Sequence, residues 1–270
     1  MGSDRGSVHN VDNRTGTQVV SRVATLLRLV AAQPAGLGTA QVVQATGLAR
    51  ATAHRLLSAL QREGLLDQDA AGNWVTGPEL FIFGAAAAAR FDVVDVARPV
   101  VRSLAARSEE SVFLSVRRGS ESVCLLAEEG SFPVRSHVLH EGIRLPLGVA
   151  SAGLVLLAFS PPGEVEEFFR HHRDLEQRYP GHDETSVRRR ARQAVRRGYA
   201  LNPGLLVEGS WGMAAPVFEA SGRATWALSI TGIEPRLAGR RQADLGRLLL
   251  EHAHDLSLRL AGGGRRPRTG

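Results

Sequence analysis

The stretch GLARATAHRLLSAL, residues 47–60, places a glycine suited to a tight turn directly before a short amphipathic segment. At about 100° per residue, Ala53, Leu56, Leu57 and Leu60 fall on one side of a helix. The opposite side carries small, polar and cationic residues. These are Ala51, Arg55, Ser58 and Arg62, with Thr52 and His54 on the flanks and Arg50 in the first turn. A helix of this kind can approach a nucleic acid closely and reach phosphates and base edges.

The segments around this helix predict a winged helix-turn-helix. Apolar residues at helical spacing predict a helix over residues 18–32, and a second short helix is expected over 39–46, before the turn at Gly47. The third helix is expected over 50–63. The sequence that follows, GLLDQDAAGNWVT at 64–76, has two strand-like runs around a turn-rich centre, which indicates a β-hairpin. Three helices and a hairpin are typical of a winged domain that holds its third helix in the major groove.

We expect this domain, residues 18–80, to bind double-stranded DNA. The expected contact residues are Arg22, Thr39, Arg50, Ala51, Thr52, His54, Arg55 and Ser58. The domain has five arginines and four acidic residues, an excess of one positive charge, so its attraction to phosphates is weak. Affinity should therefore depend on two copies that bind the half-sites of a pseudo-palindromic operator together. A winged helix that acts as a protein–protein adaptor shares this pattern and remains the alternative.

The composition is that of a folded chain with about two domains. Of its 270 residues 43% are hydrophobic and 22% are charged, and the net charge of +6 arises from 33 basic residues, all of them arginine. The single cysteine, Cys124, lies in an apolar run and is expected to be a buried structural thiol in a reducing compartment. The N-terminal segment is polar, and the longest apolar runs are short or interrupted by Pro and Gly. These features predict a cytoplasmic protein without a membrane segment.

The rest of the chain predicts a helical connector and a second, α+β domain. An alanine-rich helix makes residues 81–92 a stiff linker to a domain over 93–261. Strands are expected over 111–116, 122–128 and 132–138, with a hairpin around EASGR at 219–223. Helices are expected over 93–107, 149–159, 163–172, 184–198 and 236–260. Residues 1–17 and 262–270 are expected to be disordered tails, the second of them basic.

In this arrangement the chain resembles the IclR family of bacterial transcriptional regulators over nearly its whole ordered length. The stretch ATGLARATAHRLLSALQREGLL resembles the family's helix-turn-helix, with Ala49 where a proline is common and Gly38 where a threonine cap is common. The later segments LPLGVASAGLVLLA, RRGYALNPGLLVEG, GMAAPVFEASG and WALSITG match the family's effector domain in order and spacing. The resemblance implies a dimer or a dimer of dimers. It also implies a GAF-like α/β domain with a central antiparallel sheet that binds a small-molecule effector.

The resemblance places the effector pocket at six positions. They are Ser151, Ala152, Asn202, Gly212, Ser229 and Thr231. Ser229 and Thr231 are two residues apart on an expected strand, so both hydroxyls project from one face. The helix that starts near Ala150 offers free backbone N–H groups to an anion, which suits a carboxylate.

The chain departs from the family pattern at four positions. Asn202 stands where the family frequently has an acidic residue, and Gly212 stands where it frequently has a cysteine. Gly148 stands where a histidine is frequent, and Leu154 where a lysine is frequent. The pocket should therefore be less polar and roomier than one that holds a very small oxoacid. This favours an aromatic or larger hydrophobic acid. The candidates to line the pocket are Trp211, Met213 and Trp226, and each of them is at least as typical of an apolar core.

Motifs of catalysis and metal binding are missing from the sequence. There is no G-x-S-x-G, Walker A or H-E-x-x-H pattern, and neither histidine pair places two imidazoles on one helix face. The run SVRRRARQAVRR has an apolar side, so its arginines are interpreted as a solvated helix face. We expect no enzyme, cofactor or metal. The sequence predicts an effector-responsive transcriptional regulator, and a repressor is favoured over an activator. Besides the adaptor, the other alternative is a ligand sensor that does not bind DNA specifically.

Overall fold

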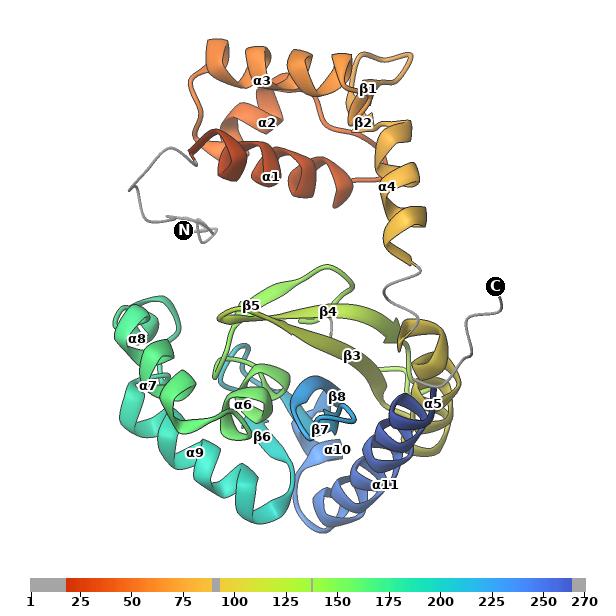
Figure 1. The fold of residues 1–270 in the computed structure, drawn as a ribbon, viewed down its shortest axis with the longest axis vertical. Coiled ribbons are helices and arrows are strands. Elements are labelled where there is room, and N and C mark those ends of the chain that lie inside the picture. The colour runs from red at the N-terminus through yellow and green to blue at the C-terminus, as the bar shows by residue number, and fades with distance from the viewer. Residues whose placement is uncertain (1–17, 89–92, 137, 264–270) are drawn as a thin grey trace. The chain divides into compact units, whose positions relative to one another are not determined.

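The structure is a computed structural model that describes residues 18–88, 93–136 and 138–263. Contacts divide the chain into two compact units, one within residues 1–90 and one within 91–270, and each is described by itself (Figure 1). The tail expected at 1–17, residues 264–270 of the tail expected at 262–270, and the linker residues 89–92 lie outside the described residues. Residues 262 and 263, expected to be disordered, instead end the last helix that the structure describes.

The first unit is a bundle of three helices closed by a hairpin. The helices α1 (Gln18–Ala31), α2 (Thr39–Thr46) and α3 (Arg50–Arg62) precede β1 (Leu66–Gln68), which pairs antiparallel with β2 (Trp74–Thr76). Their shared apolar core consists of Leu26, Val30, Val42, Leu57, Leu60, Leu66 and Trp74. The predicted winged helix-turn-helix is therefore confirmed. The helix α4 (Pro78–Ala88) follows the hairpin.

The turn between α2 and α3 depends on Gly47. Its φ is +66°, and its N–H donates to the carbonyl of Val43 at 2.9 Å, which ends α2. A Cβ at this position would meet no atom within 4 Å, so the backbone conformation, rather than lack of space, selects glycine here. This turn sets the direction in which α3 begins after Ala49.

The second unit is built on a six-stranded sheet in the order β5-β4-β3-β8-β7-β6, and all neighbouring strands are antiparallel. The strands are β3 (Ser111–Arg118), β4 (Glu121–Glu128), β5 (Arg144–Pro146), β6 (Ala200–Pro203), β7 (Ser210–Phe218) and β8 (Ala224–Ile233). The expected α/β domain with a central antiparallel sheet is confirmed. Its edges are short strands, β5 on one side and β6 on the other.

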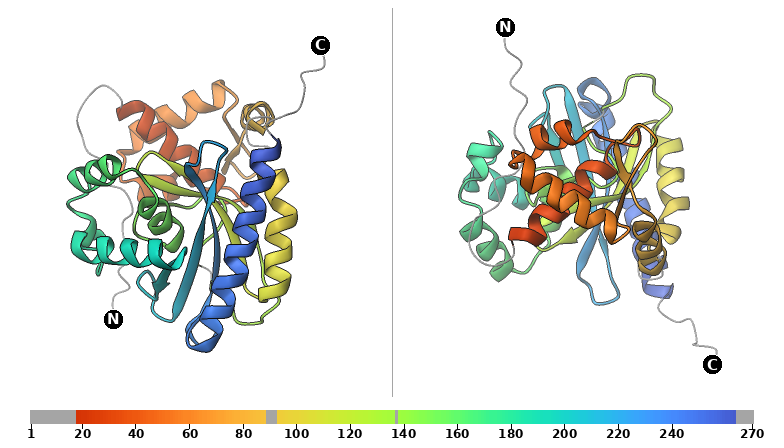
Figure 2. Two further views of the ribbon diagram at one scale, coloured as in Figure 1. Left: turned by 60° about the horizontal axis from the view of Figure 1, so that its bottom comes forward. Right: turned by 90° about the horizontal axis from the view of Figure 1, so that it is seen from above.

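Helices cover both faces of this sheet. The long helices α5 (Val93–Ser108) and α11 (Arg240–Gly263) lie side by side on one face, as the left view of Figure 2 shows. The other face carries α6 (Ser151–Ala158), α7 (Pro162–His171), α8 (Leu175–Arg178) and α9 (Glu184–Arg197), and α10 (Glu234–Leu237) follows β8. Leu228 and Ile230 of β8 pack in the core with α5 and α11, whereas Ala227 packs in the core with α6. The side chains of β8 thus point alternately to the two faces of the sheet and contribute to the apolar core on each face.

The prediction of a strand over residues 132–138 is wrong. Among its described residues none lies in a strand, because Pro133 has no backbone N–H to donate and the segment is instead an irregular connection between β4 and β5. Phe132 at its start packs under the guanidinium of Arg236, 3.9 Å from the ring centre. The short strands β5 and β6 and the short helices α8 and α10 were not expected from the sequence.

Candidate DNA interface and effector pocket

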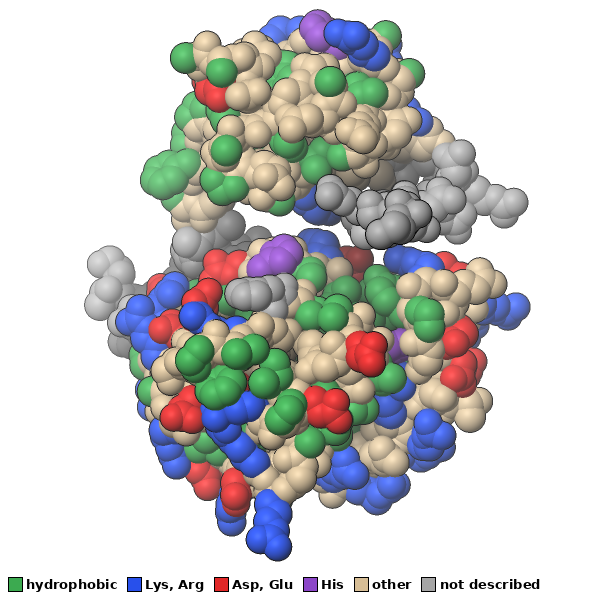
Figure 3. Space-filling model, turned by 180° about the vertical axis from the view of Figure 1, so that it is seen from behind, with side chains coloured by type: hydrophobic (Ala, Val, Ile, Leu, Met, Phe, Trp, Pro, Cys, Tyr) green, Lys and Arg blue, Asp and Glu red, His purple; other side chains and the backbone are tan. Residues whose placement is uncertain are grey.

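The helix α3 presents one polar face to solvent and one apolar face to the core. Ala53, Leu57 and Leu60 are buried, and the residues expected to contact DNA lie on the other side. Arg50, Ala51, His54 and Arg55 are exposed, and Thr52 and Ser58 are half-buried. In Figure 3, blue and purple side chains gather over α3 at the outer edge of this unit. The helix therefore has an accessible surface of small and cationic groups.

Two arginines of this face are available to phosphates or bases. Within the part of the chain that the structure describes, no carboxylate lies within ion-pair distance of Arg50 or Arg55. Arg22 on α1 is also exposed, and it donates a long hydrogen bond of 3.4 Å to Gln18. These guanidinium groups can bind an anion without first breaking an internal salt bridge.

A buried tryptophan joins the hairpin to the start of α2. The indole Nε1 of Trp74 donates to the hydroxyl oxygen of Thr39 at 2.9 Å, and the backbones of Leu37 and Trp74 exchange two hydrogen bonds. Trp74 is 2% exposed. Thr39, which the sequence predicts as a DNA contact, thus also fixes the wing. The sequence interpretation missed Trp74, although a single large aromatic residue beside a turn-rich segment signals such an anchor.

Four of the six residues predicted for the effector site line one small cavity in the second unit. They are Ser151 at the start of α6, Asn202 in β6, Gly212 in β7 and Thr231 in β8. The cavity is partly open and small, with a volume of about 20 Å³, and the rest of its wall is mainly apolar. Those other residues are Val138, Leu139, Ala150, Leu206, Ser210 and Trp211. Four distant segments of the sequence therefore meet at one site.

Most of the other residues suggested for the pocket lie elsewhere. Ala152 and Ser229 are buried but do not line the cavity, and the hydroxyl of Ser229 donates to the carbonyl of Phe113 at 3.5 Å. Of the three possible lining residues, Trp211 borders the cavity. Met213 and Trp226 instead pack in the core formed with α5 and α11.

The absence of a side chain at Gly212 keeps the cavity open. A Cβ placed there would lie 3.0 Å from Ser151 Oγ and 3.7 Å from Thr231 Cγ2. Gly212 pairs with Thr231 across the β7–β8 ladder, so even a small side chain would fill the space between these two hydroxyl-bearing residues. The position controls how much room a ligand has.

Thr231 carries a polar group that a ligand could satisfy. Its Oγ1 is buried and has no hydrogen-bond partner among the described residues, and the side chain is only 5% exposed. Asn202, in contrast, is already engaged, since its Nδ2 donates to the carbonyl of Val149 at 2.8 Å and its Oδ1 accepts from the N–H of Leu205 at 3.0 Å. An unpaired buried hydroxyl costs free energy, so a bound acceptor or donor there is favourable.

The rim of this cavity is fixed by a buried histidine. The carbonyl oxygen of Val149 lies 3.0 Å from His182 Nε2, and the carbonyl of Tyr179 lies 3.0 Å from His182 Nδ1. His182 has no exposed surface. It thereby holds the turn before α9 against the segment that leads into α6. This positioning residue was missed by the sequence interpretation, which considered histidines only as metal ligands.

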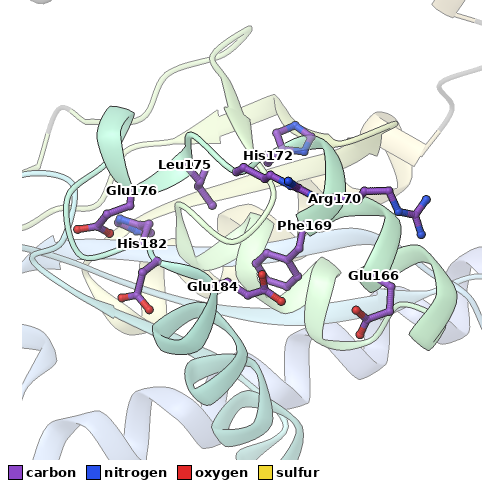
Figure 4. A pocket seen from close by; sticks show the side chains of 10 residues that line it. Glu166, Phe169, Arg170, His172, Leu175, Glu176, His182 and Glu184 are labelled. Carbon is purple, nitrogen blue, oxygen red and sulfur yellow. The ribbon is translucent and has the colours of Figure 1, made fainter.

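A wider, open hollow lies between α7, α8 and the start of α9 (Figure 4), and its volume is about 520 Å³. Its carboxylates serve the fold. Glu166 and Glu184 both pair with Arg188 at 2.8 Å. Asp183 accepts from the N–H of Ser186, and hydrogen bonds to that residue lower the pKa of Asp183. Over the described ranges, no three potential metal ligands come together. Among the described residues, this hollow therefore shows no cluster typical of a metal-binding or catalytic site.

Two further observations bear on reactivity and location. Burial, reinforced by the charge of Glu141, raises the pKa of the Cys124 thiol to about 12, so this cysteine is a poor nucleophile. Its Sγ lies 3.6 Å from the carbonyl of Leu126. Among the described residues, every helix is too short or too polar to cross a bilayer.

Known proteins resemble both units. Residues 85–258 match the family model described as bacterial transcriptional regulator IclR C-terminal, and residues 19–70 match the IclR helix-turn-helix domain. The regulator KipR of Bacillus subtilis is 28% identical over 233 residues, which cover 86% of this chain and 91% of KipR. The transcriptional repressor IclR of Escherichia coli is 24% identical over 253 residues, with 91% and 90% covered.

A solved structure shares the architecture of the chain. It is an IclR homologue from Microbacterium hydrocarbonoxydans in complex with 4-hydroxybenzoate, and it superimposes with a TM-score of 0.72 at 24% identity. The match covers 91% of this chain and all of the homologue. The same order of elements is thus found in a protein that has been crystallised with a small aromatic acid.

Proposed function

The chain belongs to the IclR family of bacterial transcriptional regulators and carries its helix-turn-helix DNA-binding domain; from this premise we propose that it is an operator-binding repressor controlled by a small organic acid. The exposed face of α3 carries the proposal for DNA. Arg50 and Arg55 are exposed and unpaired among the described residues, and Ala51 between them allows close approach to a base edge. This combination suits direct readout in the major groove.

The effector is proposed to bind in the cavity between Ser151, Gly212 and Thr231. The unsatisfied hydroxyl of Thr231 is the observation that supports it most, because such a group requires a partner. Among the described residues, no charged side chain lines the cavity, so a carboxylate would be held by hydroxyls and by the first backbone N–H groups of α6. The apolar wall with Trp211 suits an aromatic ring. We propose an aromatic acid as the class of effector.

Self-association is proposed to use α4. Phe81, Ile82 and Phe83 follow one another in this helix and are 81%, 52% and 56% exposed. Such a cluster of large apolar side chains is unfavourable in water and is explained if a second copy covers it. Pairing also supplies the second α3 that a domain with one excess positive charge needs for tight operator binding. The repressor IclR of E. coli, similar over most of its length, agrees with a repressing role.

The proposed function is tested by operator binding with and without effector. Fluorescence anisotropy with the intergenic DNA next to the gene should show sequence-specific binding that competitor DNA of random sequence does not abolish. Addition of 4-hydroxybenzoate or a related aromatic acid should change this affinity at least several-fold, since an effector acts through unequal affinity for two states. Specific DNA binding that no acid changes would contradict the proposed effector control. Absence of specific DNA binding would favour the adaptor alternative.

A further inference from the structure

A second pocket lies on the outer side of β6, between this edge strand and α9. Its wall includes three arginines, Arg189, Arg190 and Arg197, together with the polar side chains of Gln193 and Tyr199. Its volume is about 390 Å³, and it is open to solvent. Among the described residues no acidic side chain lines it, so the pocket has a positive wall.

The three arginines form no ion pairs with described residues. Within the described ranges, none of them lies within 4.0 Å of a carboxylate oxygen, although most other arginines of this domain form such pairs. Arg190 and Arg197 are seven residues apart on α9 and therefore share one face of the helix. In the same run, Arg192 and Arg196 are exposed and do not line the pocket, and Arg188 is paired with Glu166 and Glu184. The sequence interpretation of the whole run as a solvated face is thus incomplete.

Arg190 has an edge whose hydrogen-bonding groups lack partners among the described residues. Its Nη1 donates to the carbonyl of Gly181 at 2.9 Å, which fixes the guanidinium. Its Nε and Nη2 are buried and have no partner among the described residues. This side-on edge can bind two oxygens of a carboxylate or phosphate at once when the side chains that cover it move aside. Burial and the neighbouring Arg189 lower the pKa of Arg190, and the charges of Asp183 and Glu176 offset this shift only in part.

The pocket is separate from the effector cavity. Successive side chains of β6 point to opposite faces, so Asn202 lines the effector cavity while Leu201 and Pro203 line the arginine pocket. The two sites lie back to back across one strand. The loop after β6 touches both, because Leu205 lines the arginine pocket and its N–H donates to Asn202.

We propose that this arginine pocket binds a small multivalent oxyanion, a phosphate ester or a polycarboxylate, at a site distinct from the effector cavity. The Nε and Nη2 edge of Arg190 would take two oxygens of the anion, and Arg189 and Arg197 would neutralise its remaining charge. A hollow of this size suits a small molecule rather than a DNA backbone, which requires a continuous basic surface.

Calorimetry with pyrophosphate and citrate, against sodium chloride of equal ionic strength, tests the proposal on the full chain. We expect binding of at least one probe in the micromolar range, a loss of tenfold or more in Arg190→Gln, and wild-type affinity in the control Arg196→Gln. The stronger probe distinguishes the phosphate from the carboxylate source. Gly212→Ala, which narrows the effector cavity, should leave this binding unchanged. A circular-dichroism spectrum and melting temperature establish that each variant is folded.

Several results would overturn the proposal. They are absence of binding by both probes at millimolar concentration, equal losses in Arg190→Gln and Arg196→Gln, and displacement of the probe by 4-hydroxybenzoate. Loss of non-specific DNA binding in Arg190→Gln, with unchanged anion affinity, would assign the arginines to DNA instead. Failure of operator binding would not affect the test, because the probes are measured without DNA.

Discussion

Replacement of Gly212 by valine should close the effector cavity while the fold is retained. A Cβ at this position lies 3.0 Å from Ser151 Oγ, which is tight. If each carbon occupies roughly the 30 Å³ of a water molecule, the valine side chain needs roughly 90 Å³, which is more than the cavity volume of about 20 Å³. A ligand that must shift to avoid this overlap loses about 1–3 kcal/mol, which is about a 5- to 150-fold loss of affinity.

The assay is isothermal titration with the aromatic acid that binds the wild-type chain most tightly, starting from 4-hydroxybenzoate. Gly163→Val is the matched control, because a Cβ at Gly163 meets no atom within 4 Å and this residue lies in α7, away from the cavity wall. Gly212→Val should also lose the effect of the acid on operator affinity, while DNA binding itself persists. Wild-type affinity for the acid in Gly212→Val would show that the ligand binds elsewhere and would refute the assignment of the cavity.

Arg55→Ala should weaken specific operator binding by about 1–3 kcal/mol in a fluorescence anisotropy assay, whereas Arg28→Ala on α1 should change it little; equal effects of the two would contradict a reading role for Arg55. Trp74→Phe removes the hydrogen bond to Thr39 and part of a buried ring, and should therefore lower the free energy of unfolding in urea by more than the hydrogen bond alone contributes, about 0.5–1.5 kcal/mol; an unchanged value would show that this residue does not hold the wing. Asp183 caps α9, and its pKa is lowered from 3.8, so its stabilisation is present above about pH 4 and is lost as the pH falls through the folded-state pKa. Asp183→Asn keeps a capping oxygen and should therefore reduce the dependence of the melting temperature on pH below about pH 4; the same acid-induced loss in wild type and variant would disprove this assignment.

The helix-turn-helix could be predicted because its signals are local. The apolar spacing in α3, the turn at Gly47 and the turn-rich hairpin each depend on a few neighbouring residues, and the structure agrees with all three. Strands β5 and β6 escaped prediction because they have three and four residues, too few for a recognisable alternation. At 132–138 the error is the reverse, because a strand is predicted where none is present among the described residues. The apolar and β-branched residues of this segment favour a strand, but Pro133 has no backbone N–H to donate.

The candidate sites were predictable only where a pattern marks them. Asn202, Gly212 and Thr231 lie together in space because the sheet brings their strands side by side, with Ser151 at the start of α6 against them, and the family resemblance indicates this proximity. The unpaired edge of Arg190 could not be inferred in this way. Sequence spacing shows which face of a helix is polar, but it does not show whether a given guanidinium has found a partner.

We expect α3 of two paired copies to read a specific DNA sequence. This is tested by selection of sheared genomic DNA with the purified protein, followed by sequencing and footprinting of the enriched fragments. We expect a small set of fragments, each protected over two inverted half-sites whose centres are about 10 base pairs or a multiple of it apart. If no fragment is enriched at low ionic strength, with or without aromatic acids, the proposal of a sequence-reading helix is contradicted.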